Sequence, residues 1–294
     1  MTTAGGTTVE QRYARLVKLY PSRYPRDEIL DTVLQSNARF TAREAFALVV
    51  GALRARTGAD VHRGPAAFLQ SATRLAALAL LVHAAAVDLL RALPLDVPAI
   101  FQSAGGIVQY ATAGLVALAL HLAAIVTLAR GAYLLSAAAA VIGLVAGVVA
   151  GSRFGGPWVH EGFWAAPLAA VLVGGLTCTR HRERSSPLWW LLAVVPAVVL
   201  LPTGSGVMLS PALFIETQAF LVMAAIAVGW SLLDARVPVA VAALGLGNLL
   251  TIVQVVLVNG IVGDAPVAGQ VAFAAAPTLV LLVAATISRR RSPI

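Results

Sequence analysis

The chain contains 294 residues, of which 59% are hydrophobic and 12% are charged, whereas an ordinary soluble domain has about 45–50% and about 25%. This composition argues against a water-soluble fold. Residues 1–66 hold ten of the 21 basic residues and six of the 13 acidic ones, so a short polar head precedes a long apolar body. The net charge of +8 does not indicate direct nucleic-acid binding, because no motif that reads nucleic acid accompanies it.

Two residue counts exclude several kinds of chemistry. Lys18 is the only lysine and follows Val17, so the chain has no phosphate-binding loop of the form G-x-x-x-x-G-K-[ST] and no lysine in the apolar body for a Schiff base. Cys178 is the only cysteine, and it can form neither an internal disulfide nor a C-x-x-C pair. We therefore expect no ATP hydrolysis by that route and no retinal-type pigment.

Three further motifs fall short of catalysis. Ser205 lies between two glycines, but no histidine follows His181 to act as its base. Asn248 stands where the G-x-G-D motif of intramembrane aspartyl proteases has an acid, and an amide cannot exchange that proton. His160 and Glu161 are adjacent without forming an H-E-x-x-H motif. We therefore predict that the chain is not an enzyme and has no metal site or cofactor.

The polar head is predicted to contain three short amphipathic helices. The first covers about 9–20, and Pro25 suits the opening turn of the second. Thr41 and Glu44 form a capping box at the start of the third. Because no apolar stretch long enough to insert into a membrane precedes residue 66, we expect the head to stay in the cytoplasm. The predicted apolar stripe of the third helix consists of Phe46, Val49, Val50 and Leu53.

Eight apolar segments follow the head. About 20 helical residues cross the hydrocarbon layer of a bilayer, and only the fifth segment, which contains Pro196, is shorter. The predicted fold is therefore an all-α polytopic transmembrane bundle of about eight spans over 67–288. It follows a small cytoplasmic helical head at 1–66 and precedes a basic tail at 289–294. The segments lie at about 69–93, 107–129, 132–151, 163–180, 187–202, 211–233, 237–259 and 266–288.

The arginines between the segments predict the orientation of the bundle. If the head is cytoplasmic, the loops on its side carry five arginines and the tail carries three more, while the opposite loops carry only Arg153. This distribution satisfies the positive-inside rule for eight spans with both termini in the cytoplasm. Seven spans would place the arginine triplet of the tail outside. The cytoplasmic arginines are Arg130, Arg180, Arg182, Arg184, Arg236, Arg289, Arg290 and Arg291.

A series of glycines marks the third segment as a packing helix. Gly143, Gly147 and Gly151 are four residues apart, and Ala139 extends the series backward. Small residues at this spacing leave one helix face bare enough for another helix to approach closely. We favour packing within the bundle over a homodimer interface, because a bundle with many spans offers many internal partners.

Several ionisable residues lie within the first two segments. His83, Asp88 and Arg91 belong to the first, and His121 belongs to the second. Asp88 and Arg91 are three residues apart and can neutralise each other near the outer end of their helix. Each histidine is either a neutral residue hydrogen-bonded between helices, which we favour, or part of a proton relay or pH sensor.

Glu216 is the most informative single position in the body. It lies near the outer end of the sixth segment, and no basic residue is within one helical turn of it. A carboxyl group at this depth must be protonated, paired with a base from another helix, or in contact with a polar cavity. We predict an outward-facing pocket formed by Asp88, Arg91 and Glu216, with Asn248 and Gln254 deeper inside.

The head carries a family resemblance. The run Tyr13-Ala14-Arg15-Leu16-Val17-Lys18-Leu19-Tyr20-Pro21, followed by Tyr24 and Asp27-Glu28-Ile29-Leu30, resembles the permease-prefix or HAAS-type signalling domains. These domains precede transmembrane helices in proteins of GC-rich Gram-positive bacteria. The resemblance covers about residues 12–57. It implies a multi-pass protein of the bacterial cytoplasmic membrane whose head is linked to a PadR-type transcriptional regulator or to a transport system.

These observations favour a signalling or regulatory membrane protein. Its bundle would sense a membrane or small-molecule condition, and the head would relay that condition to a cytoplasmic protein through residues 9–57. The alternative is a transporter or permease subunit in which the intramembrane glutamate and histidines bind substrate or protons. We prefer signalling because the intramembrane polar groups are few and lie mostly toward the outer side.

Overall fold

The computed structural model describes residues 8–22, 24–36, 40–57, 65–93, 104–152, 164–178, 211–231, 234–259 and 265–291. Across these ranges the regular structure is α-helical without any strand, which confirms the predicted all-α class. The chain forms two compact units, Met1–His62 and Arg63–Pro293. The first unit corresponds to the polar head and the second to the apolar body.

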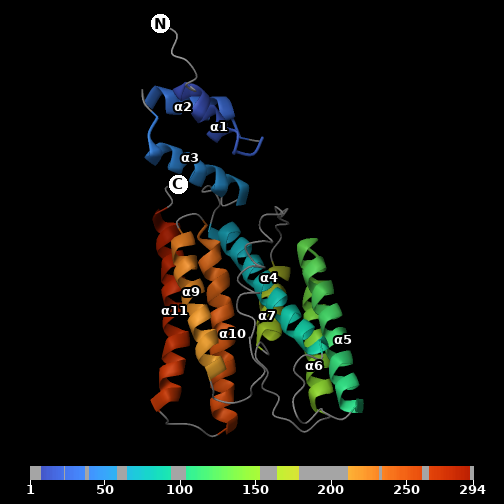
Figure 1. Cartoon of the computed structure of the whole chain (residues 1–294). Coiled ribbons are helices and arrows are strands. Elements are labelled where there is room, and N and C mark those ends of the chain that lie inside the picture. Colours follow the sequence, from blue (N-terminus) through green and yellow to red (C-terminus); the bar gives the residue numbers. More distant parts are fainter. Residues whose placement is uncertain are drawn as a thin grey trace. The chain divides into compact units, whose positions relative to one another are not determined.

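The head contains three helices, α1 (Val9–Val17), α2 (Arg26–Ser36) and α3 (Ala42–Thr57) (Figure 1). The Thr8 side chain accepts a hydrogen bond from the amide of Gln11, and the Gln11 side chain accepts one from the amide of Thr8. This reciprocal capping box satisfies two amides that the start of α1 would otherwise leave unpaired. Both α2 and α3 pack against α1.

The apolar stripe predicted for α3 is not the buried face of that helix. Phe46 is 71% exposed and Val49 is 40% exposed, whereas Leu48, Ala52 and Ala55 are buried. The α3 helix has two apolar faces, and the one with the smaller residues turns inward. That choice has a steric reason, because small residues leave room for the large tyrosines of the first unit. A Cβ added at Gly51, for example, would overlap the hydroxyl of Tyr20.

Tyr13 joins α1 to the start of α3. Its ring is completely buried, and its hydroxyl donates a hydrogen bond to the carboxylate of Glu44 and accepts one from the amide of Thr41 at 3.4 Å. The Thr41 hydroxyl accepts a hydrogen bond from the Glu44 amide at 3.3 Å, so this half of the predicted capping box is present. The Glu44 carboxylate, however, serves the contact with Tyr13.

We expect alkaline pH to weaken the head through Tyr13. Burial raises the pKa of Tyr13 above the ordinary value of 10.0, and the hydrogen bond to Glu44 raises it further. The native head therefore requires the neutral phenol. Its stabilising contribution is complete below pH 10 and is lost as the pH rises through the higher native pKa. The ionisation of Tyr13 is measured by tyrosine absorbance at 295 nm during an alkaline titration. The curve of Tyr13→Phe is subtracted from the curve of the wild-type chain. A difference curve with its midpoint at 10 or below would contradict the expectation.

The body contains seven described helices, whose positions agree with seven of the eight predicted apolar segments. The fifth predicted segment, 187–202, lies outside the described residues. Among the described residues, three stretches are long and apolar enough to cross a membrane, Ala66–Leu89, Ala111–Ala129 and Arg236–Gln254, and shorter apolar helices accompany them. The helices are α4 (Pro65–Ala92), α5 (Ala104–Ala129), α6 (Tyr133–Ser152), α7 (Ala165–Thr177), α9 (Pro211–Trp230), α10 (Arg236–Asn259) and α11 (Ala265–Arg291).

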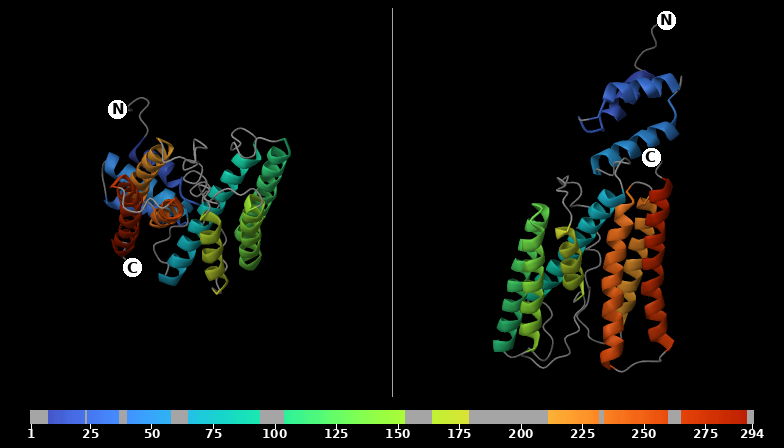
Figure 2. Two further views of the ribbon diagram at one scale, coloured as in Figure 1. Left: turned by 90° about the horizontal axis from the view of Figure 1, so that it is seen from below. Right: turned by 180° about the vertical axis from the view of Figure 1, so that it is seen from behind.

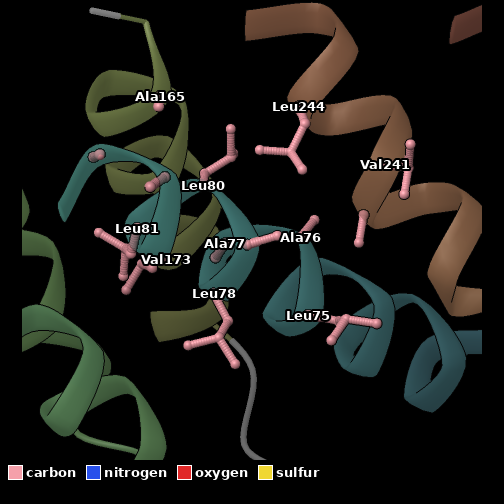
Figure 3. Packing of buried hydrophobic residues seen from close by; sticks show 14 of the residues in the cluster. Leu75, Ala76, Ala77, Leu78, Leu80, Leu81, Ala165, Val173, Val241 and Leu244 are labelled. Carbon is pink, nitrogen blue, oxygen red and sulfur yellow. The ribbon is translucent and has the colours of Figure 1, made fainter. Parts of the chain in front are cut away.

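The α4 helix is the central element of the body. It packs against α5, α7 and α10, and it crosses obliquely between the α5–α6 pair and the group formed by α9, α10 and α11 (Figures 1 and 2). All seven residues from Leu75 to Leu81 are buried. Figure 3 shows six of these side chains, all but that of Ala79, in one cluster with Val173 of α7 and Val241 and Leu244 of α10. In a membrane such contacts hold helices together by van der Waals packing, because lipid tails are as apolar as leucine.

Small residues permit the closest approaches between the body helices. A Cβ added at Gly245 of α10 would overlap the ring of Phe220 in α9 and the hydroxyl of Thr278 in α11. The three helices therefore meet at a position that only glycine fits without movement of its neighbours.

The outer surface of the body is apolar. Large hydrophobic side chains that are more than 40% exposed occur repeatedly along α5, α6 and α11. A soluble monomer rarely exposes a contiguous apolar surface of this kind, whereas a bilayer requires one. Examples are Val108, Leu115, Val116, Leu122, Leu134, Leu135, Val141, Ile142, Val145, Leu279, Val280 and Val283. Together with the three long apolar helices, this surface indicates a membrane protein.

Candidate functional site

The candidate site is a buried pair of ionisable side chains, Asp88 and His121. Asp88 belongs to α4 and His121 to α5, and the two residues are 33 positions apart in sequence. The distance between Nδ1 of His121 and Oδ2 of Asp88 is 2.6 Å, and both side chains are about 95% buried. Sequence analysis placed both residues among the intramembrane candidates but did not pair them.

The third member of the site is Gly143 in α6. A Cβ added at Gly143 would lie 3.1 Å from Nε2 of His121 and 3.3 Å from the Cβ of Leu120. The glycine therefore lets α6 approach the imidazole closely, which is packing within one chain. Gly147 and Gly151 lie in the same helix. Asp88, His121 and Gly143 thus bring three helices together at one histidine.

The second ring nitrogen of His121 determines what the site can do chemically. Nε2 is buried and has no hydrogen-bond partner among the residues that the structure describes. When Nδ1–H donates to the Asp88 carboxylate, Nε2 is left as an acceptor. The arrangement therefore holds one imidazole nitrogen on the carboxylate and keeps the other for a further contact.

The other predicted site residues occupy three helices. His83 lies in α4, one and a half turns before Asp88, and is half-buried, and Asn248 of α10 is half-buried as well. Arg91 lies in α4 and Glu216 in α9, but their side chains are outside the described part of the structure. The outward-facing pocket of Asp88, Arg91 and Glu216 therefore stays a prediction.

Gln254 has a specific partner. Its side-chain oxygen, in α10, accepts a hydrogen bond from Nε1 of Trp164 at 2.8 Å. Trp164 immediately precedes α7, so the contact joins α7 to α10. Gln254 thus has a structural contact in addition to the pocket role predicted for it.

Sequence analysis missed Arg74. This residue is 2% exposed in the first half of α4. Its Nη2 donates hydrogen bonds to the carbonyl oxygens of Leu128 and Ala129, at 3.2 and 2.8 Å. These carbonyls end α5 and have no amide partner within that helix, and a positive charge also suits the negative end of its dipole. An arginine within the apolar segment predicted at about 69–93 was the available signal.

Arg236 differs from its predicted role as an exposed loop charge. It is 5% exposed at the first position of α10. Its Nε and Nη2 bind the two carboxylate oxygens of Asp234 at 2.9 and 2.6 Å, and its Nη1 donates to the hydroxyl of Ser71 at 2.7 Å. Asp234, two residues earlier in the chain, makes this burial possible because it neutralises the guanidinium.

Within the described ranges, no group of three or more His, Cys, Asp or Glu side chains is placed to hold a metal ion. No family model matches the chain, and neither a curated protein nor a solved structure is detectably similar to it.

Proposed function

We propose that this chain is a regulatory protein of the bacterial cytoplasmic membrane, with eight spans and both termini in the cytoplasm. Its bundle senses a membrane or small-molecule condition, and its head relays the condition to a cytoplasmic partner through residues 9–57. The resemblance of the head to permease-prefix domains supports this role. The observation that carries the proposal is the buried Asp88–His121 pair against Gly143.

The position of α4 supports a relay. Asp88 lies in its second half and Arg74 in its first half, and both bind groups of α5. Only residues 58–64 separate α4 from α3 of the head. A change in the charge of the pair alters the contact between α4 and α5, and α4 is the helix through which the head is attached. Such a device requires two bundle arrangements whose balance depends on the state of the pair.

Transport is the second candidate, and the same pair favours it. Buried acid and histidine side chains form proton relays in transporters. In that case Asp88 and His121 pass protons, Glu216 contributes to the substrate pathway, and the head serves assembly with a transport system.

Hydrogen–deuterium exchange of the full chain in lipid nanodiscs tests the proposal. We expect His121→Gln and Asp88→Asn to change the exchange of head peptides from 9–57 by roughly fivefold or more, the lower range of coupling between allosteric sites. The matched control is Trp164→Phe. It removes a partly buried hydrogen bond between α7 and α10, to Gln254, which involves neither α4 nor α5, and should leave the head unchanged.

Two results would contradict a regulatory role. The first is head exchange that is identical in all variants while the body peptides change. The second is a proton flux that depends on His121, measured with a pH-sensitive dye inside liposomes, together with unchanged hydrogen–deuterium exchange of the head peptides. The second result would establish the transport alternative.

A further inference from the structure

The outward face of α3 has the pattern of a helix that lies on a membrane surface. Phe46 and Val49 are exposed, and Val50 and Leu53 are half-buried. These positions follow the i, i+3, i+4, i+7 spacing of a single helix face. We call Phe46, Val49, Val50 and Leu53 the outer stripe. It lies opposite the buried face formed by Leu48, Ala52 and Ala55, so the packing of the head leaves Phe46 and Val49 exposed and covers Val50 and Leu53 only in part.

The charges around the outer stripe are positive. At 100° per residue, Arg43 lies at one edge of the stripe and Arg56 at the other. Both side chains are exposed, and Nε of Arg56 donates to the carbonyl oxygen of Leu19 at 2.7 Å. Glu44 is the only acidic residue of α3, and it lies on the inward side with its carboxylate bound to Tyr13. The stripe therefore presents an apolar strip bordered by cations.

The chain itself limits how far this helix can be from a bilayer. The α3 helix ends at Thr57, and the first candidate span begins at Ala66. Even a fully extended connection of this length reaches only roughly 30 Å. The end of α3 is therefore tethered near the membrane surface at high effective concentration.

We propose that the outer stripe of α3 docks on the anionic lipid surface of the leaflet that faces the head. The apolar residues enter the boundary between headgroups and acyl chains, and Arg43 and Arg56 bind lipid phosphates or carboxylates at its edges. The proposal requires α4 to span the bilayer. It does not require the head to relay a signal, so the two proposals can fail separately.

Spin-label accessibility in the full chain tests the docking. Cys178, the only native cysteine, is replaced by serine, and a label is attached at Val49→Cys in the stripe or at Thr32→Cys, an exposed position of α2, as the matched control. Each protein is placed as a single copy in nanodiscs with 30% phosphatidylglycerol or with phosphatidylcholine alone. The measurement is the ratio of collisions with oxygen, which concentrates in lipid, to collisions with a water-soluble nickel chelate.

We expect a lipid-like ratio for the label at position 49 in anionic discs and an aqueous ratio for the label at position 32. Replacement of Arg43 by glutamine should lower the ratio of docked to free heads about fivefold, the contribution of one basic residue at an anionic surface. An aqueous ratio at position 49 in anionic discs would overturn the proposal. Equal docking in both lipids would overturn its anionic specificity. A label shielded from both reagents would assign the stripe to a protein contact instead.

Discussion

Replacement of Asp234 by alanine is expected to destabilise the body by about 3–5 kcal/mol, the cost of leaving one partner of a buried ion pair without the other. Arg236 is 5% exposed, and four of its hydrogen bonds end on the Asp234 carboxylate, one of them from its backbone amide. In the variant the guanidinium keeps its hydrogen bond to the hydroxyl of Ser71 on α4 but loses the carboxylate that neutralises it. Reversible unfolding of the full chain, by addition of sodium dodecyl sulfate to mild detergent micelles and followed by circular dichroism, measures the loss.

The matched control for Asp234→Ala is the double variant Asp234→Ala with Arg236→Met. Replacing both members of a buried pair by apolar groups removes the uncompensated charge, so the double variant should regain most of the lost stability. A double variant as unstable as Asp234→Ala would show that the carboxylate acts through the start of α10 and not through the guanidinium.

Replacement of His121 by leucine is expected to cost about 3 kcal/mol, because the Asp88 carboxylate loses a hydrogen-bond partner that lies 2.6 Å away in a buried site. The same detergent titration measures the effect. His121→Gln, which keeps a hydrogen-bonding group, should lose less, and Asp88→Asn combined with His121→Leu should recover part of the loss. Equal unfolding curves for wild-type and His121→Leu would contradict the pair as a stabilising contact and would also weaken the proposed function.

The sequence predicted the helices of the body well because each is a long apolar run bounded by polar, glycine or proline residues. Such boundaries are local, and the seven described helices lie close to the predicted segments. The head was also predicted as three helices. The inward face of α3 was not, because its sequence contains two apolar faces. The choice between them depends on contacts with other segments, such as the close approach of Tyr20 to Gly51.

The candidate site was predicted only as a set of separate residues. Counting residues along one helix placed Asp88 near the outer end of the first segment, with Arg91 as its neutralising partner. It placed His121 in the second segment without a named partner. The α4 helix crosses α5 and α6 obliquely (Figure 1), so a residue near its end meets one in the middle of Ala111–Ala129. A helix tilt depends on packing with neighbours and leaves no pattern in a single sequence. The burial of Arg74 and Arg236 was missed for the same reason, since their partners come from other segments.

The buried run Leu75–Leu81 has a consequence for the evolution of the chain. Most membrane helices have a lipid-facing side on which one aliphatic residue can replace another freely. In this stretch of α4 all seven side chains are buried, and its four leucines and three alanines pack against helices on different sides. A substitution that is tolerated at a lipid-facing position of another helix changes the packing when it occurs in this stretch. It must then be matched by a second change in α5, α7 or α10. This stretch should therefore diverge slowly between relatives, and where it does change, the change should be accompanied by a second one in a contacting helix.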